Sequence, residues 1–146
     1  MKKLLIAAII SLSSVTTAAV AEVKVGIILG FTGPIESLTP AMRDGARMAF
    51  DEASNSGNLL GGETITILEA DSTCVDSAAA TAAAEQLVAD GVAAIMGADC
   101  SGVTGAINAN VAVPNGVLMV SPSATSPGLS KICLLYTSPS PRDNGR

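Results

Sequence analysis

Residues 23–30 read VKVGIILG, a short run with a single charge and many β-branched side chains. This length and composition are typical of a strand buried on both faces, as strands are in parallel sheets. Three comparable segments follow along the chain: 64–70 (TITILEA), 92–97 (VAAIMG) and 116–121 (GVLMVS). The first run therefore predicts a sheet that is covered by helices on both sides.

Helical patterns separate these strands. Thr39 is predicted to cap the first helix with Pro40 at its first position, and apolar residues then recur at helical spacing: Met42, Gly45, Ala46, Ala49, Phe50 and Ala53. Asp76 is predicted to cap a second, Ala-rich helix. A third helix is expected over about 103–113, stopped by Pro114.

Strands joined by single helices require right-handed crossovers, so the fold class is α/β with a doubly wound parallel sheet. The predicted strand order is 2-1-3-4, with a fifth strand missing beyond Ile132. No internal repeat and no linker to a second domain is visible before the last residues.

The two ends are expected to lie outside this fold. Residues 1–21 have the pattern of a secretory signal peptide: Lys2 and Lys3, an apolar segment over 4–12, and Ala19-Val20-Ala21 as a cleavage site. A membrane anchor is the alternative, but the stretch turns polar from Ser11 onward, too soon for about 20 apolar residues. We therefore expect the exported domain to be 22–132 and to lie outside the cytoplasm.

The segment 133–146 breaks the alternation of strand and helix. Its string CLLYTSPSPRD resembles the translation of a transposase adapter used in DNA library preparation, in which case the native protein is interrupted near Ile132. A Pro/Ser-rich disordered tail is the alternative. Either interpretation excludes this segment from the fold.

Composition excludes several functions for the 146-residue chain. The net charge is -5 and basic residues number eight, which argues against a nucleic-acid surface. The absence of His removes imidazole catalysis and His-based metal sites. No GxGxxG, GxSxG or convincing acidic metal cluster is found, and Asp71, Asp76 and Asp99 are more plausible as caps and loop anchors. No cofactor and no metal are expected.

In open α/β sheets, ligands bind beyond the carboxyl ends of the strands. That rule selects three loops: 31–38, 98–104 and 122–127. Each is rich in Gly, Ser or Thr, whose small side chains let a ligand approach the backbone and whose hydroxyls can donate to a carboxylate. For any one of these residues, a plain helix cap is the alternative.

Four motifs occur together in order: KVGIILGFTGPIESLTPAMRDGARMAFDEAS, ADSTCVD, GADCSGVT and LMVSPSATSPGLS. Over residues 23–131 the chain resembles the type I periplasmic substrate-binding proteins of ABC transporters, in the branched-chain amino acid (Leu/Ile/Val) group. The resemblance implies a monomer with two lobes that close on a small amino acid. The closed protein would deliver this solute to a membrane ABC permease. This chain would hold most of the first lobe.

The resemblance also implies ligand contacts. Ser101 and the loop Ser123-Ala124-Thr125 match the positions that hold the α-carboxylate and α-ammonium groups. The Ser101 and Thr125 hydroxyls and nearby backbone N–H groups would serve the carboxylate, while the Ser123 carbonyl and the Thr125 hydroxyl could accept from the ammonium. Leu38 stands where leucine-binding members commonly have an aromatic residue, so amides or urea remain possible ligands.

The family has a disulfide at the pair that corresponds to Cys74 and Cys100. Both follow strands at the same end of the sheet, and export favours oxidation. Two free buried thiols are the alternative, and a catalytic Cys would lack a base. Two other classes stay open: an enzyme on a similar fold, and the extracellular sensor domain of a signalling receptor. A non-catalytic capture protein is the preferred interpretation.

Overall fold

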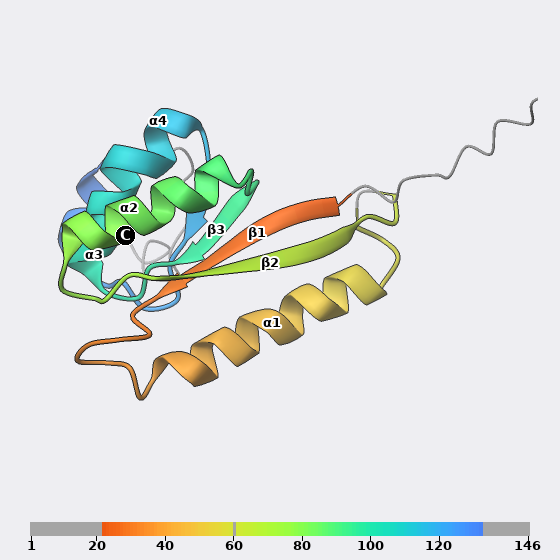
Figure 1. Ribbon diagram of the computed structural model, residues 1–146, viewed down its shortest axis with the longest axis horizontal. Helices are drawn as coiled ribbons and strands as arrows, with labels where there is room; N and C mark the ends of the chain where they lie inside the picture. The colour runs from red at the N-terminus through yellow and green to blue at the C-terminus, as the bar shows by residue number, and fades with distance from the viewer. Residues whose placement is uncertain (1–21, 60, 133–146) are drawn as a thin grey trace, which may run out of the picture.

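The computed structural model describes residues 22–59 and 61–132. The signal peptide and the tail predicted above lie outside the described residues. Strands and helices alternate along the chain (Figure 1). The elements are β1 (Glu22–Leu29), α1 (Thr39–Asn55), β2 (Thr64–Asp71), α2 (Ser77–Ala89), β3 (Ala94–Gly97), α3 (Ser101–Ile107), the π-helical η1 (Asn108–Ala112), α4 (Val113–Asn115), β4 (Leu118–Val120) and the 3-10 helix η2 (Pro127–Lys131).

The four strands form one sheet in the order β2-β1-β3-β4, and every pair is parallel. Gly26 of β1 lies opposite Leu68 of β2 and Ile95 of β3, and Ile95 lies opposite Met119 of β4. The predicted α/β fold and strand order are therefore confirmed. The position of the expected fifth strand falls outside the described residues.

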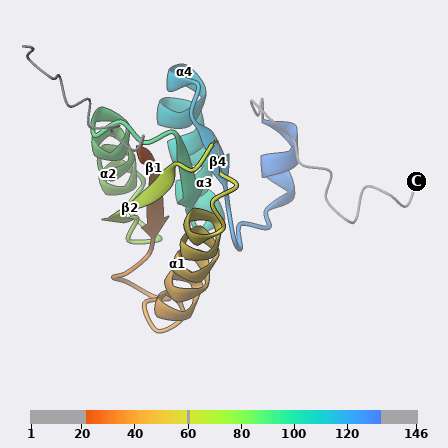
Figure 2. The same ribbon diagram turned by 90° about the vertical axis from the view of Figure 1, so that its right-hand side faces the viewer.

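Helices cover both faces of the sheet, with α1 on one side and α2 and α3 on the other (Figures 1 and 2). Ile28 and Ile95 point to the α2–α3 side and join the main core, together with Ala80, Ala84, Leu87, Val103, Ile107 and Val111. Ile27, which alternates with Ile28, points to the opposite face and is also fully buried. Both faces of β1 are thus covered, as its apolar run predicts.

Helix α2 lies close to the sheet because β1 has a glycine where the two meet. A Cβ atom at Gly26 would lie 2.9 Å from Leu87 Cδ1. The small Ala80 and Ala84 face the core from the same helix and are fully buried. Small residues on the strand and on the helix therefore set this spacing.

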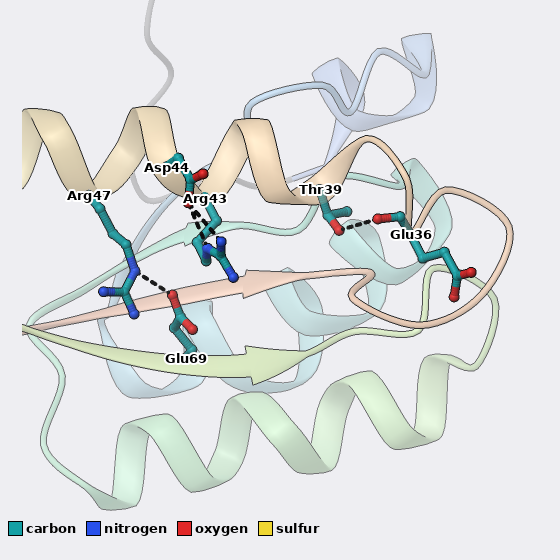
Figure 3. Close-up of polar contacts among 6 residues, drawn as sticks. All are labelled: Glu36, Thr39, Arg43, Asp44, Arg47 and Glu69. Atoms are coloured by element: carbon teal, nitrogen blue, oxygen red, sulfur yellow. Dashed lines mark hydrogen bonds and ion pairs between the residues drawn. The ribbon is translucent and has the colours of Figure 1, made fainter.

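The start of α1 differs from the expectation. Leu38 occupies the N-cap position without a side-chain cap bond, and Thr39 is the first helical residue, with Pro40 after it. Leu38 already has helical dihedral angles (φ -95°, ψ -27°), so the helical turn begins one residue early. Thr39 is fully buried, and its hydroxyl donates to the Glu36 carbonyl at 3.1 Å (Figure 3). The prediction of Thr39 as the N-cap was wrong.

The outer surface of α1 carries charged residues that pair locally. Arg43 contacts Asp44 on the helix itself, and Arg47 reaches Glu69 on β2 at 2.8 Å (Figure 3). Glu69 also raises the pKa of the exposed Arg47, first through the hydrogen bond and then through its charge. Of these two pairs, only Arg47–Glu69 joins α1 to the sheet, and exposed pairs of this kind add little stability.

The apolar stripe of α1 is only half-buried. Between this helix and the sheet lies an apolar groove of about 420 Å³. It is lined by Val25, Ala46, Ala49, Phe50, Ala94, Ile95, Met96, Leu118 and Val120. The two faces of the sheet are therefore packed unequally, with the denser core on the α2–α3 side.

The helical run after β3 is longer than expected. It begins at Ser101 and continues through η1 and α4, so Pro114 lies inside it and does not stop it. In η1 the Val113 N–H donates to the Asn108 carbonyl, five residues back, which shifts the hydrogen-bond ladder just before the proline. The run ends where Gly116 adopts a left-handed conformation (φ +66°).

Candidate functional site

Two of the three loops selected from the sequence are joined by one side chain, Ser101. This residue is the first of α3, and its Oγ accepts hydrogen bonds from the Thr125 and Ser126 N–H groups, both at 3.1 Å. A serine hydroxyl has two acceptor positions and one O–H donor. Because both acceptor positions are filled, the chemistry Ser101 still offers is donation of its O–H.

The Ser123-Ala124-Thr125 segment is held by the end of β3 as well. The Ser123 hydroxyl donates to the Asp99 carbonyl at 2.9 Å, and the Ala124 N–H donates to Ser121 Oγ at 2.9 Å. Ser123 and Thr125 are exposed, and Ala124 is half-buried. The structure therefore brings together all four residues that the sequence selected: Ser101, Ser123, Ala124 and Thr125.

Two backbone N–H groups of this loop are already bonded within the protein. The Thr125 and Ser126 N–H groups both donate to Ser101. The cause is the closeness of the two loops, which lets one hydroxyl fill two backbone donors. The donor that remains at this position is then the Ser101 O–H.

Sequence reasoning missed the part played by Ser121. Its hydroxyl donates to the Ala98 carbonyl and accepts from the Ala124 N–H, so it fastens the turn after β4 to the end of β3. A signal was present: a serine followed by proline, with backbone donors two and three residues later, is a common side-chain turn.

Asp99 lies beneath these loops and is almost entirely buried, with 3% of the residue exposed. Its Oδ2 accepts from the Gly30 N–H at 2.8 Å, and its Oδ1 accepts from the Cys100 N–H at 3.0 Å. Ser72 Oγ lies 3.4 Å from the same Oδ1. The carboxylate thus contacts the residues that follow β1, β2 and β3, which confirms its interpretation as a loop anchor.

Asp71 and Asp76 also anchor loops, as predicted. Asp76 Oδ1 accepts from the Ala78 and Ala79 N–H groups and caps α2. Asp71 receives the Thr32 hydroxyl at 2.6 Å and thereby ties the loop after β1 to the end of β2. Partial burial would raise the pKa of Asp71, but hydrogen bonds led by those from the Thr32 hydroxyl and the Thr73 N–H outweigh it, so the pKa is lowered.

Cys74 and Cys100 form a disulfide, with 5.2 Å between their Cα atoms, so the alternative of two free thiols was wrong. The bond joins the loop after β2 to the residue that directly precedes Ser101. Thr73 and Cys74 both have positive φ angles, at 55° and 70°. Covalent and polar contacts therefore converge on the start of α3.

The third loop, 31–38, closes the same end of the sheet. Gly33 has a φ of +99°, and a Cβ there would lie 2.5 Å from the Thr73 carbonyl oxygen, so only glycine fits this approach. Leu38 ends the loop and is 57% exposed. The position where an aromatic residue would match the family pattern therefore holds an exposed aliphatic side chain.

Comparison with known proteins identifies the family. The profile of the family described as periplasmic binding protein matches residues 22–146, so the chain belongs to this family. The Leu/Ile/Val-binding protein BraC3 of Rhizobium johnstonii is 34% identical over 111 residues, which are 76% of this chain and 29% of that protein. The leucine-specific-binding protein of Salmonella typhimurium is 31% identical over 129 residues, which are 88% and 34%.

The fold agrees with solved structures of the same group. The branched-chain amino acid transporter substrate-binding protein of Streptococcus pneumoniae, crystallised with isoleucine, has 33% sequence identity and a TM-score of 0.69. The match covers 76% of this chain and 31% of that one. The chain therefore spans about a third of the length of these relatives. Within residues 22–59 and 61–132, no helix has the length and apolar character needed to cross a membrane.

Proposed function

We propose that the complete protein captures a small α-amino acid between two lobes in the periplasm and delivers it to a membrane ABC permease, without catalysis. The residues 22–132 supply most of one lobe. The observation that carries this proposal is the arrangement of Ser101, whose acceptor positions are filled by Thr125 and Ser126 while its O–H is left to donate. The relatives are amino-acid-binding proteins and a transporter substrate-binding protein, which favours this function over a receptor's sensor domain.

Ser101 and the 123–125 segment form a polar rim at this end of the sheet. Its hydrogen-bond donors and acceptors suit the two charged ends of an amino acid. A carboxylate accepts hydrogen bonds, so the Ser101 and Thr125 hydroxyls are its proposed donors. An ammonium only donates, so its proposed acceptors are the Ser123 carbonyl and the Thr125 hydroxyl oxygen. Ala124 would hold these groups in place through its bond to Ser121.

The side-chain preference is proposed to be aliphatic. Leu38 is exposed on the loop after β1 and can contact a branched aliphatic side chain, as can the neighbouring half-buried Ile35. A small amide or urea would use the same hydroxyls without an apolar contact. L-isoleucine, L-leucine and L-valine are therefore tested beside acetamide and urea.

The test is calorimetric titration of the complete gene product and of its Ser101→Ala/Thr125→Ala variant. Hydrogen bonds to charged groups contribute about 1.5–3 kcal/mol each, so the affinity of the double variant should fall by at least about 100-fold. The control is Ser56→Ala/Thr64→Ala, which removes the same two residue types at exposed positions. Ser56 directly follows α1, and Thr64 is the first residue of β2. Unchanged affinity in the first variant, or no binding of any of the five solutes by the wild type, would refute the proposal.

A further inference from the structure

Asp99 is the one carboxylate among the described residues that is buried, and the solute contacts proposed above make no use of it. The two ion pairs of the described region join Arg43 to Asp44 and Arg47 to Glu69, so neither neutralises Asp99. Its carboxylate is stabilised instead by the N–H groups of Gly30 and Cys100 and by the Ser72 hydroxyl. A buried carboxylate that is held by such neutral donors is sensitive to their geometry.

The backbone of Asp99 leads directly to the solute-binding residues. Its carbonyl accepts from the Ser123 hydroxyl, so one residue holds the loop after β1 through its side chain and the loop after β4 through its backbone. Cys100 follows as the N-cap of α3 in an extended conformation, without a side-chain cap bond of its own. The Asp99 carboxylate accepts the Cys100 N–H at the residue immediately before Ser101.

We infer that Asp99 is a positioning residue of the binding site. Its buried carboxylate fixes the loop after β1 against the start of α3, and its carbonyl fixes Ser123, so that Ser101 and the 123–125 segment face the solute in one arrangement. The solute itself is contacted by Ser101 and Thr125, and Asp99 acts through them. The identity of the solute in this inference rests on the proposed function. The positioning role of Asp99 rests on its hydrogen bonds alone.

Asp99→Asn is a sharp probe because the asparagine amide has one oxygen and one NH₂ group. The Gly30 and Cys100 N–H groups approach different oxygens of Asp99, so either orientation of the amide sets its NH₂ group against one of them. Asp76→Asn is the matched control. Both N–H groups that Asp76 caps approach the single oxygen Oδ1, so asparagine keeps them while the charge changes equally.

The experiment titrates the complete gene product with L-isoleucine, at a temperature where thermal unfolding shows each variant to be folded. Asp99→Asn should bind at least about tenfold more weakly, which corresponds to about 1.4 kcal/mol, and Asp76→Asn should bind within about twofold of the wild type. Because Asp99 acts through Ser101 and Thr125, the triple variant D99N/S101A/T125A should bind no more weakly than S101A/T125A alone. Wild-type affinity in D99N, or additive losses in the triple variant, would overturn the inference.

Hydrogen exchange of the solute-free protein gives a second measurement that needs no ligand. The Thr125 and Ser126 N–H groups are bonded to Ser101 and not to Asp99. If Asp99 positions Ser101, exchange over peptides spanning 122–130 should be faster in D99N than in D76N. Acceleration confined to the segments around Gly30 and Cys100 would mean a local role only and would overturn the inference.

A wild type that binds no amino acid would refute the proposed function, while the exchange result still decides the part played by Asp99.

If D99N does not fold, Ser123→Ala takes its place. This variant removes the hydroxyl that donates to the Asp99 carbonyl and leaves the Ser123 carbonyl in place. Faster exchange over 122–130, with weaker isoleucine binding, would support the inference, and unchanged exchange in that segment would overturn it.

Discussion

Removing the Cys74–Cys100 disulfide should destabilise the chain by an amount that follows from the length of the loop it closes. The two cysteines are 26 residues apart in sequence. For a loop of that length, the loss of chain entropy in the unfolded state corresponds to about 3.5 kcal/mol at 25 °C. The Cys74→Ala/Cys100→Ala variant should therefore unfold at a urea midpoint lower by roughly 1.2–3.5 M, for an m-value of about 1–3 kcal/mol/M.

A matched variant separates this loop effect from backbone strain. Cys74 has a φ of +70°, a conformation that costs an L residue roughly 1–2 kcal/mol and glycine much less. Cys74→Gly/Cys100→Ala should therefore be more stable than the double-alanine variant by roughly 1 kcal/mol.

The assay is urea unfolding followed by circular dichroism at 222 nm, on chain purified under oxidising conditions. A reductant added to the wild type should reproduce the destabilisation of the double-alanine variant, and it should leave that variant unchanged. Equal midpoints for the wild type and the double-alanine variant would refute the loop-closure argument, and equal midpoints for the alanine and glycine variants would refute the assignment of strain to Cys74.

Two further predictions concern the core and the loop after β1. Leu87→Ala should lower the free energy of unfolding by about 2–5 kcal/mol, because this side chain is 3% exposed and packs over Gly26; Met48→Ala, 70% exposed, is the control and should change it by less than about 0.5 kcal/mol in the same urea titration. Asp71 has a lowered pKa in the folded chain, so its stabilising contribution is complete above the unfolded value of about 3.9 and is lost as the pH falls through the lower folded value. Asp71→Asn should accordingly lower stability at pH 7 and flatten its decline below about pH 4, and a decline identical to that of the wild type would contradict the assignment.

Much of the fold could be predicted because its signals are local and repeated. The apolar run of β1 predicts burial on both faces, and Ile27 and Ile28 are both fully buried on opposite sides. The alternation of strands and helices predicts a parallel sheet, and the order 2-1-3-4 is that of a doubly wound sheet with helices on both faces. The cap at Asp76 was correct because it depends only on the nearby N–H groups of Ala78 and Ala79, two and three residues further on.

The helix boundaries were less predictable because they depend on contacts between distant segments. Thr39 has the residue type of an N-cap, but burial of its side chain places it inside the helix. Pro114 has the residue type of a helix stop, but the π-helical turn before it moves the hydrogen-bond ladder by one residue. Residue propensities alone predict neither the burial of Thr39 nor the shifted hydrogen bonds before Pro114.

The candidate site also has a part that the sequence predicts and a part that it does not. The residue types at 101 and 123–125 could be selected from the sequence, since small hydroxyl residues gather where the strands end. Their pairing could not, because the bond from the Thr125 N–H to Ser101 joins residues 24 positions apart. The contacts of Asp99 with residues after β1 and β2 likewise exist only once the sheet has formed.

The bond between Ser101 and the 125–126 backbone has a thermodynamic consequence for any solute that meets this rim. Ordering one residue of a free loop costs roughly 1–2 kcal/mol in conformational entropy. Here two backbone amides are already oriented before a solute arrives, so that cost belongs to folding and not to association. Calorimetric titrations at several temperatures should then show a smaller loss of solute affinity on warming than a loop that becomes ordered only on binding would show.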